Sequence, residues 1–448
     1  MRLVMRRQFE ERDSDMKNRK TFTAGIFVVA AALAGLPSGV MPSAGAQAAA
    51  FNLTQTLDDP TVTSADNFGI SVSISGNKVL IGASRDETTG ADVGQAHLFD
   101  VTTGALLQTF DDPTPTTGDD FGNSVAISGN NVLVGASGDD TNGSNVGQAH
   151  LFDATTGALL QTFNDPTPST SADFFGFSVA ISGNNVLIGA AGDRTNGTSV
   201  GQAHLFDATT GALLQTFNDP TVTGSDLFGF SVAISGNNVL IGAEGDDTNG
   251  VDVGQAHLFD ATTGALLQTF DDPTPTSSDR FGISVAISGN NALVGAALDD
   301  TNGPLVGQAH LFDVTTGALL QSFNDPTPTA SDQFGVSVAI SGNNVLIGAL
   351  GDDTNGLNVG QAHLFDATTG ALLQTFDDPT PTGSDSFGSV AIDGNTLVIG
   401  AGFDDTNGAN VGQANLFTAL PEPGTLSLFG IGLIGLMLRR RNRLARPA

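Results

Sequence analysis

The chain has no cysteine, tryptophan or tyrosine among its 448 residues. The absence of cysteine excludes a disulfide framework, which suits an exported protein that needs no disulfide but does not identify a compartment. Without the two largest aromatic residues, a core must come from Val, Ile, Leu and Phe, with small residues where sheets approach closely. Basic residues are also scarce: 16 Lys and Arg stand against 47 Asp and Glu, a formal net charge of −31.

One stretch of about 53 residues is written seven times. A Phe-Gly pair opens each copy, and successive pairs lie 53 or 54 residues apart. A fixed period in this range indicates stacked supersecondary units. The seven pairs begin at Phe68, Phe121, Phe175, Phe228, Phe281, Phe334 and Phe387.

Each copy predicts four short strands, as the sixth copy illustrates. Residues 337–341 alternate large and small side chains, which is the period of a strand, and a Gly-Asn-Asn turn leads to a second strand over 345–349. Residues 361–365 and 371–376 are the expected third and fourth strands, and prolines in the following linker end the fourth strand. Seven such units predict an all-β, seven-bladed β-propeller of four-stranded antiparallel blades.

The two ends of the repeat array complement each other. The last copy stops after its third strand, at Phe417, whereas residues 51–60 (FNLTQTLDDP) precede the first copy and match the fourth strand and linker of the others. We therefore expect the N-terminal strand to complete the last blade and close the ring.

Three regions are expected along the chain. Residues 1–50, with a basic start at 16–20 and an apolar run at 22–36, predict a signal peptide; Met16 is an alternative start, and a retained membrane anchor is the alternative interpretation. Residues 51–420 are the propeller. Residues 421–448 hold a 15-residue apolar run and then arginines, which predicts a short transmembrane segment with a cytoplasmic basic end.

The loop after the second strand is the best candidate for a metal site. It carries an Asp-Asp-Thr-Asn-Gly sequence in most copies, and Asp and Asn oxygens before a glycine resemble calcium loops. No acid stands two residues earlier and no Glu closes the loop, so turns stabilised by Asp and Asn are the alternative. The candidate calcium ligands are Asp139, Asp140, Asn142, Asp246, Asp247, Asn249, Asp299, Asp300, Asn302, Asp352, Asp353 and Asn355.

Two other polar positions recur in the copies. An Asp stands two residues before every Phe-Gly, as Asp119 does, and is either a turn cap or a partner of the first loop in binding ions. All six histidines occupy one Gly-Gln-Ala-His slot, which places each on a different blade and argues against a metal site that they share. No Ser-His-Asp set, distinct carboxylate pair or phosphate loop stands out, so we expect no catalytic residues and no enzyme.

Acidic residues are expected to gather on one face of the disc. In an antiparallel blade, the loop after the second strand and the linker after the fourth lie on the same face, opposite the two tight turns. Of 42 acidic residues between 51 and 420, 35 fall in the longer segments, with only three basic residues. Such a face repels nucleic acid and attracts cations or cationic partners, although a surface that only favours solubility is the alternative.

The C-terminal region resembles the PEP-CTERM sorting signals of Gram-negative bacteria. The residues that carry the likeness are Pro421, Glu422 and Pro423, then the apolar run, then Arg439, Arg440 and Arg441. The resemblance implies export, transient anchoring in the inner membrane, cutting by an exosortase-type protease, and delivery to the cell surface, outer envelope or extracellular matrix.

The repeats resemble the FG-GAP repeats of integrin α-chain propellers, and more closely a bacterial subgroup with the pattern FGxSVAISGNNVLIGA. The calcium loop of that family lies between the first two strands, where this chain has only Ser-Gly-Asn-Asn, so that site does not carry over. We expect a binding or adhesion module, assisted by calcium in the Asp-rich loops, whose partner is an extracellular polysaccharide or surface protein. A structural surface protein without a specific ligand and a propeller hydrolase are the alternatives.

Overall fold

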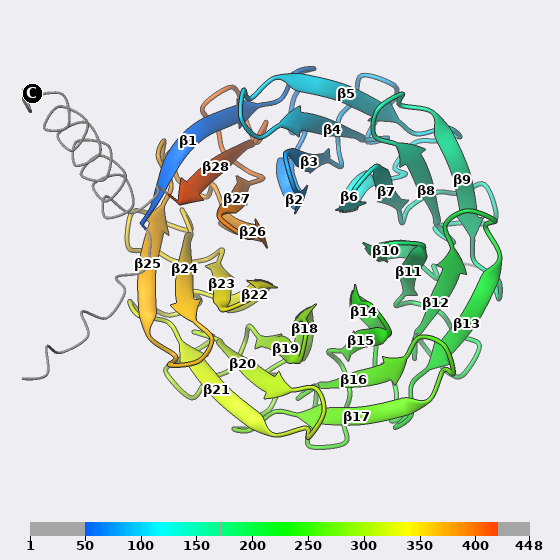
Figure 1. The fold of residues 1–448 in the computed structure, drawn as a ribbon, viewed down its shortest axis with the longest axis vertical. Helices are drawn as coiled ribbons and strands as arrows, with labels where there is room; N and C mark the ends of the chain where they lie inside the picture. Colours follow the sequence, from blue (N-terminus) through cyan, green and yellow to red (C-terminus); the bar gives the residue numbers. More distant parts are fainter. Residues whose placement is uncertain (1–49, 170–171, 420–448) are drawn as a thin grey trace, which may run out of the picture. The chain divides into compact units, whose positions relative to one another are not determined.

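The computed structural model describes residues 50–169 and 172–419, which form seven four-stranded antiparallel sheets arranged in a ring (Figure 1). The predicted propeller is confirmed. The predicted signal peptide and the predicted C-terminal transmembrane segment lie outside the described residues. The described part contains no helix, and therefore none that could cross a membrane.

The first and second strands of the blades lie toward the axis of the ring (Figure 1). The first strands are β2 (Phe68–Ser75), β6 (Phe121–Ser128), β10 (Phe175–Ser182), β14 (Phe228–Ser235), β18 (Phe281–Ser288), β22 (Phe334–Ser341) and β26 (Phe387–Asp393). The second strands are β3 (Lys78–Ala83), β7 (Asn131–Ala136), β11 (Asn185–Ala190), β15 (Asn238–Ala243), β19 (Asn291–Ala296), β23 (Asn344–Ala349) and β27 (Thr396–Ala401).

The third and fourth strands lie toward the rim. The third strands are β4 (Gln95–Asp100), β8 (Gln148–Asp153), β12 (Gln202–Asp207), β16 (Gln255–Asp260), β20 (Gln308–Asp313), β24 (Gln361–Asp366) and β28 (Gln413–Ala419). The outermost strands are β5 (Leu106–Asp111), β9 (Leu159–Asn164), β13 (Leu213–Asn218), β17 (Leu266–Asp271), β21 (Leu319–Asn324), β25 (Leu372–Asp377) and β1 (Phe51–Asp58).

The first strand starts three residues earlier than its alternating pattern indicates. In the sixth blade it begins at Phe334 rather than Ser337, because a bulge between these residues interrupts the pairing with β23. The Phe-Gly pair is therefore part of the strand, and its extra residue hides the two-residue period.

The N-terminal strand closes the ring as predicted. β1 pairs antiparallel with β28, so the seventh sheet has the order β1-β28-β27-β26. Leu57 lies in the core between the seventh and first blades, and the Phe51 backbone exchanges hydrogen bonds with the Gln374 side chain of the sixth blade. No blade edge is left open at this junction.

The core lies between blades rather than within one sheet. Val125 and Ile127 of β6 pack against Leu80, Leu98 and Phe110 of the preceding blade. The opposite face of β6, with its smaller side chains, meets the following blade. Each fully buried Val or Leu contributes roughly 1.5–3 kcal/mol, so the same apolar contacts, repeated at every junction, hold the ring together.

One pair of glycines explains how neighbouring blades approach so closely. A Cβ atom built on Gly135 in β7 would lie 2.0 Å from the carbonyl oxygen of Gly176, the glycine of the next Phe-Gly pair. Gly176 itself has a φ of +93°, a conformation that other residues rarely adopt. The repeated Phe-Gly and Gly-Ala dipeptides therefore meet each other across every blade junction.

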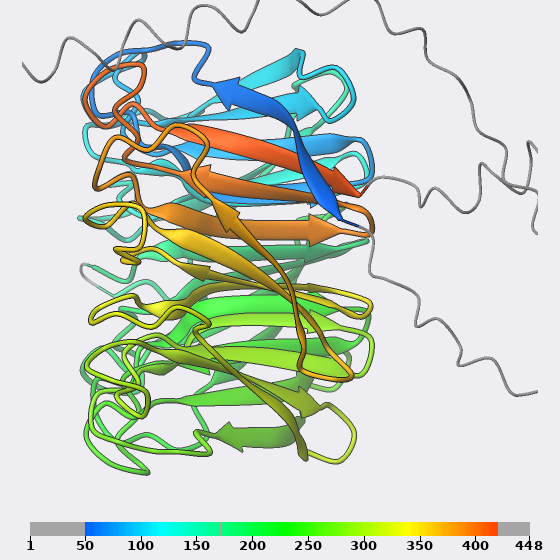
Figure 2. The ribbon, with the colours of Figure 1, turned by 90° about the vertical axis from the view of Figure 1, so that its left-hand side faces the viewer.

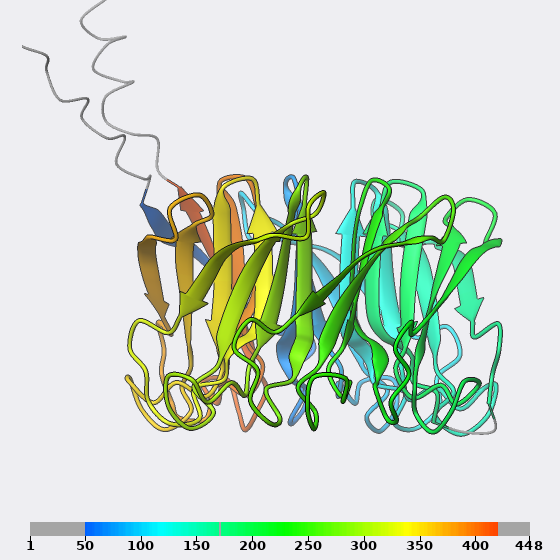
Figure 3. The same cartoon turned by 90° about the horizontal axis from the view of Figure 1, so that it is seen from below.

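The two faces of the disc differ in their connections. The longer loop after each second strand and the linker after each fourth strand lie on the same face, and the two tight turns of each blade lie on the other (Figures 2 and 3). In the first junction, Gly118 N donates to Ala91 O at 3.1 Å and Phe121 N to Val93 O at 2.8 Å, which ties the linker to the loop. We call these the long-loop face and the tight-turn face.

Candidate functional site

A cluster of buried polar side chains lies at each blade junction, inside the long-loop face. In the first blade it is formed by Asp59 from the linker after β1, Asp66 just before β2, and Asp86 just after β3, with His97 of β4 behind them. Their relative exposures are 5%, 0%, 0% and 0%. Three chain segments that are distant in the sequence thus bring three carboxylates together.

Local turns hold each carboxylate in place. Thr61 N donates to Asp59 Oδ1 at 2.8 Å, and Thr88 N donates to Asp86 Oδ1 at 2.7 Å. Each carboxylate thus accepts from the backbone N–H two residues later, which is an Asx turn. The backbone and hydroxyl of Thr63 both donate to Asp66. Each turn fixes its carboxylate, and one carboxylate oxygen each of Asp59 and Asp86 and one ring nitrogen of His97 lie within 4.8 Å of one another.

The cluster recurs in every blade with the same residue types. Among the described residues there are seven groups in which ligand-type atoms from at least three acids or histidines lie within 4.8 Å of one another. The three acids of successive blades are Asp59, Asp66 and Asp86; Asp112, Asp119 and Asp139; Asp165, Asp173 and Asp193; Asp219, Asp226 and Asp246; Asp272, Asp279 and Asp299; Asp325, Asp332 and Asp352; and Asp378, Asp385 and Asp404.

A threonine hydroxyl and a glutamine amide complete each cluster. Thr61 Oγ1 lies 3.1 Å from Asp59 Oδ1, 2.9 Å from Asp86 Oδ2 and 2.8 Å from Gln95 Oε1. The amide nitrogen of Gln95 donates to Asp111 at the end of the outermost strand, at 2.6 Å. The cluster therefore connects all four strands of its blade to the incoming linker.

The histidine of each cluster has one ring nitrogen bonded and one unpartnered. His150 Nδ1 lies 3.1 Å from Thr162 Oγ1, whereas Nε2 has no hydrogen-bond partner and is 4.0 Å from Asp112 Oδ1. Burial lowers the pKa of His150 to about 4, so the ring is neutral at physiological pH. In the seventh blade Asn415 takes this position, and its Nδ2 is likewise unpartnered.

The linker carboxylates are the least satisfied acids. Asp112 Oδ2 is buried without a partner, as is the same atom in the other six blades. Burial raises the pKa of Asp112 to about 6, with Asp119 and Asp139 adding to the rise and the Thr114 backbone opposing it. Seven repeated groups thus keep a free oxygen in the interior, where unmet polar atoms are costly.

The structure divides the calcium ligands predicted from sequence into two groups. The first Asp of each loop is buried in a cluster, whereas the second Asp and the Asn are exposed. Asp140 accepts a hydrogen bond from Asn145 N at 2.7 Å and Asn142 donates to Asn164 at 2.7 Å, so they stabilise the loop away from the carboxylates. The buried members are Asp139, Asp246, Asp299 and Asp352; the exposed ones are Asp140, Asn142, Asp247, Asn249, Asp300, Asn302, Asp353 and Asn355.

The clusters also change the account of the acidic face. Of the 35 acids assigned to it, the 21 cluster aspartates and Glu244 are buried. Most of the negative charge expected at this surface therefore lies beneath it, and the field that reaches solvent is weaker than the sequence count indicates. Sequence reasoning missed the linker Asp, the Thr two residues after it and the Gln of the third strand.

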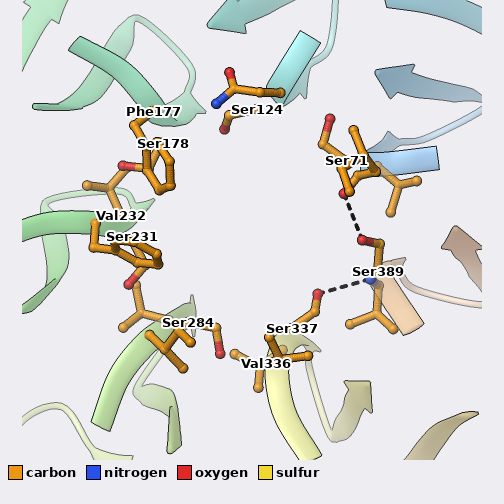
Figure 4. A pocket seen from close by; sticks show the side chains of 18 of the residues that line it. Ser71, Ser124, Phe177, Ser178, Ser231, Val232, Ser284, Val336, Ser337 and Ser389 are labelled. Atoms are coloured by element: carbon orange, nitrogen blue, oxygen red, sulfur yellow. Dashed lines mark hydrogen bonds between the residues drawn. The ribbon is translucent and has the colours of Figure 1, made fainter. Parts of the chain in front are cut away.

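A central channel lies at the axis of the ring. A cavity of about 410 Å³ is lined by the third to fifth residues of the first strands, including a ring of seven serines (Figure 4). These hydroxyls join neighbouring blades: Ser178 Oγ donates to Gly229 O at 2.7 Å, and Ser389 Oγ donates to Ile70 O at 2.8 Å. The serines are thus engaged with backbone, which leaves no sign of an activated nucleophile among them.

The repeat is broken beside this ring. Phe177 and Phe230, whose ring centroids are 4.8 Å apart, occupy a position that is Ile in the first and fifth blades. A second cavity of about 460 Å³ adjoins the channel at Leu350 and is lined by Phe403, which stands where most blades have glycine. Side chains that differ between blades therefore gather around one pair of cavities.

A second departure from the repeat is an ion pair between the fourth and fifth blades. Glu244 is buried, at 3% exposure, and lies 3.6 Å from Arg280 Nη1. Burial raises the pKa of Glu244 to about 7, Arg280 opposes the rise and Asp252 adds to it. The carboxyl does not line either cavity, so it is not placed to act on a ligand there.

Comparison with known families gives two matches. The model of the FG-GAP repeat matches seven segments: residues 52–99, 114–152, 169–206, 220–259, 274–312, 327–365 and 381–417. The PEP-CTERM protein-sorting motif matches residues 419–441, which indicates export and sorting to the cell surface or envelope through exosortase-type machinery. No curated protein matches the chain.

Proposed function

The chain belongs to the FG-GAP repeat family, and on that basis we propose that it is a non-enzymatic binding or adhesion module of the cell surface or extracellular matrix. In this proposal residues 1–50 direct export and the C-terminal region holds the chain briefly in the inner membrane. An exosortase-type protease then cuts near Pro421, Glu422 and Pro423. The partner outside the cell is an extracellular polysaccharide or a surface protein.

The observation that carries the binding role is the grouping of unrepeated side chains at the channel. The lining of the two adjoining cavities differs from blade to blade. Phe177 and Phe230 stand where other blades have Ile, Asn or Val, and Leu350 stands where others have Ser, Ala, Glu or Gly. Phe403 stands where four blades have Gly. Ligand sites are typically concave, rich in apolar and aromatic side chains, and supplied with a few polar groups. Gln333, Asn358 and Asn410 provide such groups in the second cavity.

Several features support binding rather than catalysis. FG-GAP repeats are typically non-catalytic. The channel serines are bonded to backbone, and the histidines are buried in the third strands with pKa values lowered to about 4. Glu244, which stands where the other blades have Ser, Ala, Leu or Gly, is paired with Arg280 outside both cavities. Assistance of binding by calcium is part of the proposal.

Retention on matrix polysaccharide tests this proposal. Purified full-length protein is passed over polysaccharide extracted from the cells that make it, and bound protein is measured against concentration. We expect saturable retention that weakens at least about tenfold in the double variant Phe177→Ile with Phe230→Ile, and in Phe403→Gly. Each change inserts a residue that another blade already carries at that position, so the fold is expected to tolerate it.

The control is Leu160→Thr on the outermost strand of the second blade. Leu160 is 45% exposed and lies far from the axis, so its loss should leave retention unchanged. Absence of saturable retention, or equal weakening by the control, would refute the polysaccharide role and favour a structural surface protein. Turnover of any substrate by the purified chain would refute the non-enzymatic role.

A further inference from the structure

We propose that each of the seven buried clusters holds one calcium ion, bound by the linker carboxylate and the two carboxylates of the following blade. The proposal concerns the interior of the ring and does not depend on the surface role argued above. Its ligand set differs from the exposed Asp-Asn loop that the sequence suggested. In the fourth blade the acids are Asp219, Asp226 and Asp246.

Each cluster has fewer hydrogen-bond donors than its acceptors require. Gln255 Nε2 donates to Asp271 Oδ1 at 2.6 Å, and since a carboxylate only accepts, the amide orientation is set and Oε1 faces Thr221 Oγ1 at 2.8 Å. The same hydroxyl lies 3.2 Å from Asp219 Oδ1 and 3.1 Å from Asp246 Oδ2. The single hydroxyl proton of Thr221 cannot be donated to all three oxygens. At least one of these short oxygen–oxygen contacts therefore has no proton between the two atoms, and a cation bound by both oxygens would remove the repulsion.

The negative charge of the cluster acids is not compensated by a cationic side chain of the described residues. The described residues contain four cationic side chains, Lys78, Arg85, Arg194 and Arg280, and none forms an ion pair with a cluster acid. Three carboxylates in a dry interior are costly unless a counter-charge is present, and a divalent cation supplies it.

Each cluster also contains buried polar atoms without a hydrogen-bond partner. Asp219 Oδ2 and His257 Nε2 are both buried and have no partner in the described structure. Each belongs to a side chain more than nine-tenths buried, and Nε2 lies 4.0 Å from the other carboxylate oxygen of Asp219. An ion between the acids gives the orphaned carboxylate oxygen a partner, either directly or through a bound water.

The donor set favours calcium over a transition metal. Carboxylate, hydroxyl and amide oxygens surround the position, and calcium takes six to eight such ligands. The imidazole nitrogen is absent from the seventh blade, where Asn415 replaces histidine. The Thr380 hydroxyl there still contacts the carboxylates of Asp378 and Asp404, as its counterparts do in other blades. An ion that required imidazole would not suit that blade. Held there, calcium joins the outer end of one blade to the first strands of the next.

Ion stoichiometry tests the proposal. The full-length chain is stripped with EGTA, confirmed to be folded, and loaded with calcium, magnesium or zinc before bound ions are counted by native mass spectrometry and elemental analysis. We expect close to seven calcium ions per chain in preference to the other metals. Asp219→Asn should reduce the count by one, because it removes one charged ligand from one cluster.

The matched control is Asp247→Asn, one residue beyond Asp246 in the same loop but exposed and bonded to Asp252 N. It should leave the count unchanged. A folded wild-type chain that binds no calcium, a preference for zinc, or a loss of the ion in Asp247→Asn but not in Asp219→Asn would overturn the proposal. The wild-type count decides the question even if Asp219→Asn fails to fold, and polysaccharide retention is a separate readout.

Discussion

His150 Nε2 lies 4.0 Å from Asp112 Oδ1, and both side chains are fully buried. The separation is too long for a hydrogen bond, yet the geometry repeats in the preceding blade and in the three that follow. The imidazole packs beside the carboxylates without a hydrogen bond to Asp112, and its Nδ1 contact with Thr162 fixes its orientation.

We expect His150→Asn to be tolerated and His150→Ala to be costly. Asn415 occupies the same slot in the seventh blade, where it contacts the Thr56 hydroxyl, so His150→Asn should lower the free energy of unfolding by less than about 1 kcal/mol. His150→Ala leaves a cavity and an unpaired Thr162, and should cost roughly 2–4 kcal/mol. Chemical denaturation measures both; equal costs would contradict this role.

Gly135→Ala should destabilise the ring strongly. The new Cβ would meet the Gly176 carbonyl oxygen at 2.0 Å, and because that atom belongs to backbone, the two blades must separate. We expect a loss of roughly 2–4 kcal/mol in the free energy of unfolding. Gly224→Ala is the control, since nothing lies within 4 Å of its Cβ position and its φ is not positive. A loss in the control as large as in Gly135→Ala would rule out the steric explanation.

Arg280→Gln should destabilise the protein only while Glu244 is present. Removing the guanidinium leaves a carboxyl at 3% exposure without its charge partner, at a cost of about 1–2 kcal/mol near pH 7.5. Glu244→Ala should be neutral or stabilising, because Ala191 and Ala297 fill this position in neighbouring blades. A double-mutant cycle measures the coupling, and strictly additive effects would show that the pair does not interact.

The aspartates of the tight-turn face should stabilise the folded protein at pH values at which their carboxyl groups are ionised. Backbone and hydroxyl hydrogen bonds from Thr156, and a further one from the Thr155 backbone, lower the pKa of Asp153 below its usual value. A lowered folded-state pKa gives stability that is present above the unfolded pKa of about 3.9 and is lost as pH falls through the folded value.

Asp153→Ala is therefore expected to lower the thermal midpoint at pH 7 and to approach wild type as the pH falls through the lowered folded-state pKa of Asp153. Midpoints of the two proteins at matched pH, with salt held constant, give this difference directly. A difference that stays constant from pH 7 down to the acid limit would mean that the carboxylate form contributes nothing beyond packing.

The sequence predicts the fold well because the spacing of the strands and the Gly, Asn and Pro residues of the turns recur along the repeats. The Phe-Gly spacing and the unmatched strand at residues 51–58 were enough to predict seven blades and their closure. The site was harder to predict. Asp139 and Asp119 were both recognised as repeated acids, but Asp112 sits in an Asp-Pro-Thr linker whose proline suggested only the end of a strand. Its recurrence in all seven copies was the available signal.

The histidines illustrate a different difficulty. Their separation onto different blades correctly argues against a site that they share, yet each one meets the acids of its own junction. Which acids approach His97 depends on the incoming linker from β1, which is close in space through ring closure. Sequence spacing does not contain that information, because the linker belongs to the preceding blade.

The most direct test of the account is thermal unfolding of the full-length chain against calcium concentration, with magnesium and sodium chloride as controls. A ligand that binds only the folded state raises the midpoint as its concentration rises. We predict a calcium-selective rise that saturates and is reversed by EGTA. No rise, or the same rise with magnesium or plain salt, would contradict the assignment of the seven buried clusters as calcium sites.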